Sequence, residues 1–167
     1  PFEGRIWGVK PVCQHLRVIP DFCSFRGLLV LAGNQNTPNA DANPVAGQPQ
    51  SGLWFGITDD LWNWGKPQGW GGPWRNTPIE AGQVSDPFLM TGFDKKVLHV
   101  AQQGASSLEL KIEVDFLGNG SWQLYEVLRL SESRPYVFHV FPDGFSAHWV
   151  RLAASRACRI SAQLFYT

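Results

Sequence analysis

The sequence predicts an all-β fold, an antiparallel and jelly-roll-like β-sandwich with long loops rich in Trp, Gly and Pro. Apolar and polar residues alternate through 108–116, which is typical of a strand with one buried and one wet face. The stretch Gly118-Asn119-Gly120 follows, and its glycines suit a tight β-turn. No segment has the pattern of a helix longer than two turns. We therefore expect a single domain over 1–167.

The irregular half of this domain is expected at 1–104. The apolar run 27–33 predicts a strand buried on both faces, and 53–58 predicts another strand. Between them, 34–51 is rich in Asn, Pro, Gly and Gln, which predicts a long polar loop. Asp59 then stands where it would cap a short helical turn.

The regular half is expected at 105–167, as an antiparallel meander. Before it, 88–91 and 96–102 predict a hairpin that turns at 92–94. Five strands follow, separated by short turns: 108–116, 122–130, 136–141, 148–153 and 158–166.

Two architectures fit these elements, a two-sheet sandwich or the terminal part of a larger β-structure such as a propeller. The strand at 27–33 favours the sandwich, because it is apolar on both faces and needs two covering layers. A propeller repeat of roughly 40–50 residues is not visible in the sequence.

Charge and hydropathy exclude two classes of partner. Fourteen basic and fourteen acidic residues cancel, and no Lys/Arg cluster occurs, so nucleic acid is not an expected partner. No apolar run approaches the roughly 20 residues that span a bilayer, so a membrane is not expected either. The chain lacks a signal-peptide pattern and does not begin with Met, which we interpret as a processed product or an excised fragment. Its richness in Trp, Gly and Asn favours a secreted, cell-surface or periplasmic protein.

The three cysteines leave their redox state open. Cys13 and Cys23 could form a disulfide across a loop, or all three thiols could be free and buried. Cys158 lies in an alternating strand and is expected in the core. Zinc is not expected, because no Cys-x-x-Cys or His-x-x-x-His spacing occurs, and no other cofactor is implied. A structural calcium could be ligated by Asp, Asn and carbonyl groups of 34–43 or 115–119.

Tryptophan is concentrated in one short region, since five of the eight lie between Trp54 and Trp74. Gly and Pro interrupt this region every few residues, which predicts a loop over 54–75. Indole rings in a loop either plug the end of a β-core or form a platform for sugar rings, and we expect about two of them to be structural. The candidate carbohydrate-binding residues are the rings of the platform and their polar neighbours: Trp62, Trp64, Trp70, Trp74, Asp59, Asp60, Asn63, Lys66, Gln68 and Arg75.

Candidates for catalysis are few. Cleavage of a sugar bond needs two carboxyl groups roughly 5–10 Å apart, and Asp86 with Asp59 or Asp60 could supply them. His15 could transfer a proton while Arg17 holds a uronate, and His148 is a further candidate. Capping, turn formation and ordinary strand packing explain each of these residues as well. No signature of acyl transfer or nucleotide chemistry is present.

Several motifs carry a family resemblance from Arg17 onward. They are 21–27 (Asp-Phe-Cys-Ser-Phe-Arg-Gly), Asp59-Asp60-Leu61-Trp62 with Gly65-Lys66-Pro67, Trp70-Gly71-Gly72-Pro73-Trp74, 85–92 (Ser-Asp-Pro-Phe-Leu-Met-Thr-Gly) and 141–149 (Phe-Pro-Asp-Gly-Phe-Ser-Ala-His-Trp). With these motifs, the chain resembles the C-terminal portion of large bacterial secreted proteins with β-propeller and β-sandwich domains, thought to act on polysaccharides. The resemblance covers most of the chain and implies a polysaccharide or oligosaccharide ligand.

Three functions follow as hypotheses. The first is a carbohydrate-binding β-sandwich module of a secreted, polysaccharide-active protein. The second is a fragment of a glycoside hydrolase or polysaccharide lyase that adds residues to an active site shared with another domain. The third is a docking module whose indoles bind a neighbouring domain or subunit. The isolated chain is expected to lack enzyme activity by itself.

Overall fold

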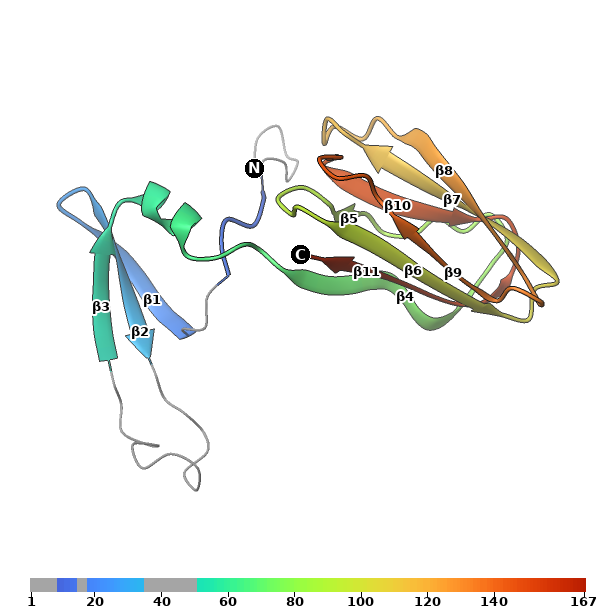
Figure 1. The fold of residues 1–167 in the computed structure, drawn as a ribbon, viewed down its shortest axis with the longest axis horizontal. Coiled ribbons are helices and arrows are strands. Elements are labelled where there is room, and N and C mark those ends of the chain that lie inside the picture. The colour runs from blue at the N-terminus through green and yellow to red at the C-terminus, as the bar shows by residue number, and fades with distance from the viewer. Residues whose placement is uncertain (1–8, 15–17, 35–50) are drawn as a thin grey trace, which may run out of the picture. The chain divides into compact units, whose positions relative to one another are not determined.

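The computed structural model describes residues 9–14, 18–34 and 51–167, and its chain divides into two compact units. One unit contains Pro67–Thr167 together with residues 9–11, and the other is Val12–Lys66. The sequence predicts a single domain over 1–167, whereas the chain has two compact units. Within the described residues, every regular element is a β-strand except one short 3-10 helix, and every strand pair is antiparallel (Figure 1).

The larger unit is a sandwich of two four-stranded sheets. We call them sheet I, with the order β5-β10-β7-β8, and sheet II, with the order β4-β11-β6-β9. Their strands are β4 (Gly69–Ile79), β5 (Phe88–Leu89), β6 (Lys96–Gln103), β7 (Ser107–Asp115), β8 (Gln123–Ser131), β9 (Tyr136–Val140), β10 (Trp149–Ala154) and β11 (Cys158–Tyr166). Because the chain crosses between the sheets, these two orders are those of an eight-stranded jelly roll. The predicted all-β, jelly-roll-like sandwich is therefore confirmed.

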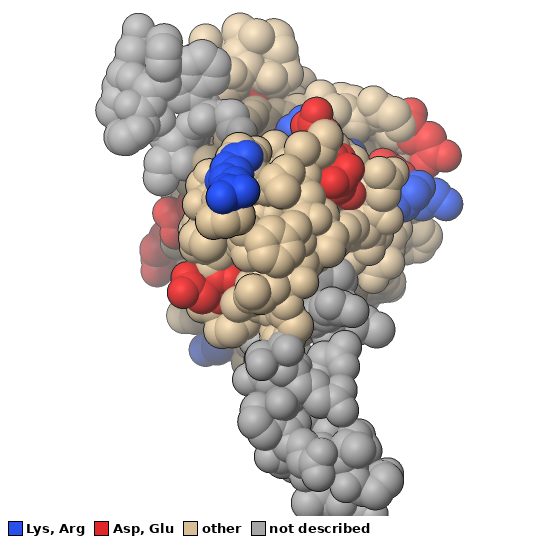
Figure 2. Space-filling view, turned by 90° about the vertical axis from the view of Figure 1, so that its left-hand side faces the viewer, with Lys and Arg blue, Asp and Glu red and all other residues tan. Residues whose placement is uncertain are grey.

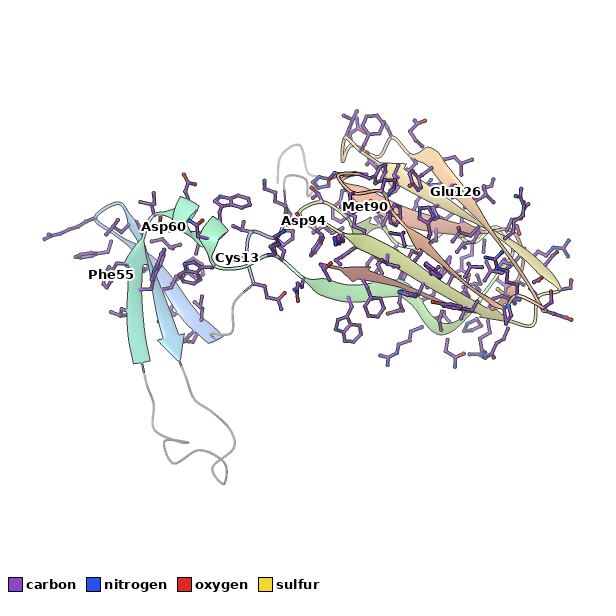
Figure 3. The ribbon with its side chains drawn as sticks, in the orientation of Figure 1. Cys13, Phe55, Asp60, Met90, Asp94 and Glu126 are labelled. Carbon is purple, nitrogen blue, oxygen red and sulfur yellow. The ribbon has the colours of Figure 1, made fainter. Side chains whose placement is uncertain are left out.

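The hydrophobic core fills the space between the two sheets, and alternation along the strands explains it. In β6, residues Leu98 and Val100 are fully buried, while His99 between them lies on the outer side. Met90 is also fully buried, and Figure 3 shows it among the side chains of the sandwich. Each fully buried aliphatic side chain contributes roughly 1.5–3 kcal/mol to stability. Burial of alternate residues thus fixes which face of each strand remains exposed.

The predicted meander is wrong, although all five of its strands exist. Among them, only β7 and β8 pair as consecutive strands; β9 pairs with β6, β10 with β5 and β7, and β11 with β4 and β6. The predicted hairpin of 88–91 and 96–102 is wrong for the same reason, since β5 joins sheet I and β6 joins sheet II. Alternation shows that a strand has one buried face but not which sheet supplies that face. A short connection can therefore cross between sheets as readily as it turns back within one.

The predicted loop over 54–75 is also wrong, because much of this region is strand. It contains the end of β3 (Ser51–Gly56), the 3-10 helix η1 (Thr58–Asn63) and the first part of β4. β4 is an edge strand, where Pro73 is tolerated. At Gly72 a Cβ atom would meet the carbonyl group of Ala162 on β11, so glycine permits a close approach of the two backbones. Gly and Pro in this strand therefore indicate an irregular edge rather than a loop.

The smaller unit is a three-stranded sheet with the order β1-β2-β3. It contains β1 (Val18–Phe25) and β2 (Leu28–Asn34), joined by a turn in which Arg26 and Gly27 both have positive φ, together with β3. The strand predicted at 27–33 is β2, but it lies in this sheet and not inside the sandwich, and among residues 28–33 only Val30 and Leu31 are buried. The short helical turn is η1. Its N-terminus is capped by the carboxylate of Asp60 rather than Asp59, because Asp60 accepts a hydrogen bond from the N–H of Ile57 at 3.1 Å.

Candidate functional site

The outer surface of sheet II carries a group of aromatic and apolar side chains, which we call the aromatic face. Its members come from all four strands of the sheet and alternate with core residues. Five of them are exposed, namely Trp70, Tyr136, Phe138, Val140 and Phe165, and two are half-buried, namely Val97 and His99. Trp70 is 70% exposed and Phe138 is 60% exposed, which is unusual for side chains of this size. A contiguous exposed patch of this kind commonly marks a binding surface.

One row of this face crosses the whole sheet. Trp70 on β4 is paired with Phe165 on β11, Phe165 is paired with Val97 on β6, and Val97 is paired with Val140 on β9. With neighbouring strands about 4.8 Å apart, the row is roughly 14 Å wide. A parallel row contains Gln163, His99 and Phe138 in the same strands. The sheet therefore presents its rings on one common surface.

His99 lies at the centre of the aromatic face. Its ring packs edge-on against Phe165 with centroids 5.2 Å apart, and it lies 6.3 Å from the ring of Phe138. Its Nδ1 is hydrogen-bonded to the hydroxyl of Tyr136 at 2.8 Å. These contacts place two groups with hydrogen-bonding capacity among apolar rings.

The aromatic face ends in a small polar pocket of about 290 Å³. Tyr136 lines it together with Asn76, Arg159 and Ser161. The Arg159 guanidinium donates a hydrogen bond to the Asn76 carbonyl at 2.7 Å, and the Asn76 N–H donates to the Ser161 hydroxyl at 2.8 Å. An extended ligand on the rings could therefore reach polar groups at this end.

The outer surface of sheet I has a different character, because it carries paired charges. Arg129 donates to Glu109 at 3.1 Å, and Arg151 donates to Glu113 at 2.6 Å. Figure 2 shows a different face, the left-hand side of Figure 1, where the visible Lys and Arg are scattered rather than gathered in a stripe. The two outer surfaces of the sandwich thus differ, because the aromatic face covers part of sheet II and Arg159 stands at the end of that face.

The predicted carbohydrate-binding residues are divided between the two units. Asp59, Asp60, Trp62, Asn63, Trp64 and Lys66 belong to the smaller unit, whereas Gln68, Trp70, Trp74 and Arg75 belong to the sandwich. Trp70 is the member of this set that the structure brings to the aromatic face. Trp74 is 4% exposed and is part of the core, which is the structural role expected of some rings. In the smaller unit, Trp64 packs edge-on against Trp54 with centroids 4.8 Å apart, and Trp62 is 52% exposed.

The predicted catalytic candidates do not form a site in the described residues. His15 and Arg17 lie outside the described residues. Asp86 is exposed, and its backbone carbonyl accepts a hydrogen bond from the Ser85 hydroxyl at 2.9 Å. His148 packs against Trp149, with its Nε2 buried and lacking a hydrogen-bond partner among the described residues.

The cysteines and the acidic residues have other roles than those considered. Cys13, Cys23 and Cys158 are free thiols, so the disulfide between Cys13 and Cys23 is not formed, and Cys23 is exposed rather than buried. Asp115, a candidate calcium ligand, instead uses its carboxylate to accept hydrogen bonds from backbone N–H groups of its own loop. Residues 35–43 of the other candidate loop lie outside the described residues. In the part of the chain that the structure describes, no group of three or more His, Cys, Asp or Glu is placed to hold a metal.

Two buried titratable groups, Lys96 and Tyr166, are not members of the aromatic face. Burial lowers the pKa of Lys96, which Asp94 opposes, and its Nζ donates to the carbonyls of Phe93 and Phe145 at 2.7 and 2.9 Å. Burial raises the pKa of Tyr166, whose ring stacks on that of Phe93. Lys96 therefore connects the loop before β6 with the loop before β10.

Most of the aromatic face is absent from the sequence-based set. A signal for it exists in 136–141, where Tyr-Val-Phe-His-Val-Phe is apolar at nearly every position although β9 is an edge strand. An edge strand that is apolar on both faces indicates either a second covering layer or an exposed patch.

Comparison with known proteins gives no relatives from which a function could be transferred. Neither protein-family models, nor curated proteins, nor solved structures match this chain. Within the described residues, no helix has the length and hydropathy needed to cross a membrane.

Proposed function

We propose that this protein is a carbohydrate-binding β-sandwich module and that its aromatic face is the binding surface. The observation that carries this proposal is the 70% exposure of Trp70 in a paired row with Phe165. The apolar C–H surface of a sugar ring packs on aromatic faces, and nearby polar groups bond its hydroxyls. His99, the Tyr136 hydroxyl and the polar pocket at Arg159 supply such groups. Jelly rolls also occur as lectin domains, which is support by analogy alone.

The proposal is tested by titrating the chain with soluble neutral and acidic polysaccharides while following tryptophan fluorescence. Binding should be saturable with one glycan class and should weaken about tenfold or more in Trp70→Ala, a loss of about 1.4 kcal/mol. Val84→Ala is the matched control, because it removes another exposed apolar side chain outside the aromatic face. Equal binding by Trp70→Ala and the intact chain would refute this site.

The enzyme-fragment hypothesis has less support. None of the four strands of sheet II contains Asp or Glu, whereas hydrolysis of a glycosidic bond generally needs two carboxyl groups. On the aromatic face, the Nδ1 atom of His99 is already hydrogen-bonded to the hydroxyl of Tyr136. We therefore expect binding without release of reducing ends, measured over prolonged incubation with the bound glycan.

A docking module is the second candidate, and one observation favours it. Phe138 and Val140 offer exposed apolar surface without hydrogen-bonding groups, which suits a protein partner better than a glycan. In that case no glycan would shift the fluorescence, and Phe138→Ser would reduce concentration-dependent association in sedimentation velocity.

A further inference from the structure

A second surface hollow lies on the opposite side of the sandwich, over the outer surface of sheet I. We call it the Trp122–Trp149 pocket. Its volume is about 650 Å³, and its walls are the two indoles, Pro87 and the loop from Asp115 to Gly120. This size falls within the usual range of small-ligand sites, roughly 300–1,000 Å³.

Strand geometry positions both indoles. Trp149 begins β10, where it pairs with Leu89 on one side and Asp115 on the other, and it alternates with the core residue Val150. Arg151 is two residues further on the same outer surface, and its guanidinium lies 4.2 Å from the centre of the Trp122 ring. Glu113 fixes that guanidinium by accepting a hydrogen bond from Nε at 2.6 Å. The Trp122 ring is therefore held in place before any ligand arrives.

The loop from Asp115 to Gly120, which forms part of the pocket wall, is also held in place before a ligand binds. The Asp115 side chain is 1% exposed and accepts hydrogen bonds from the N–H groups of Gly118 at 2.8 Å and Gly120 at 2.7 Å. Gly118 has a φ of 71°, and a Cβ there would lie 3.0 Å from the His148 ring. The chain must therefore have glycine at this position to close the loop over His148.

We propose that the Trp122–Trp149 pocket binds one ring of a neutral sugar, stacked on an indole. The walls contain no basic residue, and the one nearby cation, Arg151, is neutralised by Glu113, so the pocket offers nothing to a carboxylate or phosphate. Asn119 is exposed and lines the pocket, and its side-chain amide can both donate to and accept from sugar hydroxyls. Two half-buried indoles provide the apolar surface against which the ring packs.

This site does not depend on the aromatic face, because the two surfaces belong to different sheets. The test uses the full chain labelled with 5-fluorotryptophan, with each ¹⁹F resonance assigned by single Trp→Phe variants. The probes are the neutral hexasaccharides of cellulose, xylan and mannan, and an acidic hexamer of galacturonate. At least one neutral probe should shift the Trp122 and Trp149 resonances saturably, whereas the galacturonate hexamer should not.

Two variants decide the outcome. Trp149→Leu keeps apolar bulk and should weaken the neutral probe about tenfold or more at the Trp122 resonance, whereas Leu53→Ala, at an exposed apolar residue of the smaller unit, should leave this affinity unchanged. Arg151→Lys keeps the charge but loses the planar contact with Trp122, and it should weaken binding several-fold with an unchanged circular dichroism spectrum. Shifts at Trp70 alone, shifts only with galacturonate, or no shift at all would overturn the proposal. A loss in Trp70→Ala with binding retained in Trp149→Leu would also overturn it, while leaving the aromatic face in place.

Discussion

At the scale of single residues, two buried polar groups show opposite ways of handling burial. Asp115 is buried with both carboxylate oxygens hydrogen-bonded to its own loop. Tyr166 is 7% exposed, and its hydroxyl has no hydrogen-bond partner among the described residues. An unpaired buried hydroxyl costs free energy, whereas a fully bonded carboxylate stabilises its loop. The contribution of each group to stability can be measured with a substitution that changes few atoms.

Tyr166→Phe should stabilise the fold by roughly 1 kcal/mol, because it removes the unpaired hydroxyl and keeps the ring stacked on Phe93. The substitution should also reduce the loss of stability that the intact protein shows at alkaline pH. Burial raises the pKa of Tyr166 above its ordinary value of 10.0, so above that pH the unfolded chain binds fewer protons than the folded chain. Stability of the intact protein therefore falls as pH rises past 10.0. Urea unfolding from pH 8 to 11 measures both effects, and Tyr136→Phe, at an exposed tyrosine, is the control.

Asp115→Asn should destabilise the fold by roughly 1–3 kcal/mol, because the amide replaces one acceptor oxygen with a donor that faces a backbone N–H. Asp143→Asn is the matched control, since Asp143 is exposed. Thermal unfolding compares the two. An equal midpoint for both variants would contradict the anchoring role of Asp115.

At the scale of elements, the two adjacent glycines of β4, Gly71 and Gly72, have different surroundings. Gly72 lies where a Cβ would meet the Ala162 carbonyl, whereas a Cβ at Gly71 would have ordinary contact with Phe88 at 3.6 Å. The pairing of β4 with β11 is irregular on both sides of Ala162, as expected of a bulged edge. We expect only one of these adjacent glycines to be essential.

Gly72→Ala should therefore destabilise the sandwich by roughly 1–3 kcal/mol through overpacking. Gly71→Ala should be neutral or slightly stabilising, because it reduces the freedom of the unfolded chain. Chemical unfolding of both variants under the same conditions tests the pair. If both variants lose a similar amount of stability, the close approach of β4 to β11 is not specific to Gly72, which would contradict the prediction.

The sequence predicts strands better than it predicts their partners. The strands of 105–167 are found because each has one buried face, as in Leu108, Leu110 and Ile112. The sheet to which each strand belongs cannot be predicted in this way, because a local sequence pattern does not show which distant strand it pairs with. Trp70 could be proposed as a ligand contact from composition, but Phe165 and Tyr136 join it only through pairing across β11, β6 and β9. A surface built from four strands is visible only after the fold is known.

At the scale of the whole molecule, the protein has no net charge near neutral pH and a large exposed apolar surface. The formal net charge is zero at pH 7 and the isoelectric point is about 7.4. Little electrostatic repulsion then opposes association of the exposed rings. Solubility should consequently be lowest near neutral pH and should depend on where a new charge is placed.

Phe138→Lys should raise solubility at pH 7.4 more than Leu117→Lys does, although both add one positive charge at an exposed apolar position. Leu117 lies in the loop between β7 and β8, outside the aromatic face, so the difference between the variants isolates that face from net charge. Precipitation by polyethylene glycol at pH 5.5, 7.4 and 9 measures it. If the two variants gain equally at pH 7.4, charge alone limits solubility and the aromatic face does not drive association. If Phe138→Lys gains more and the difference persists at pH 5.5 and 9, the face itself is adhesive, as its exposed rings require.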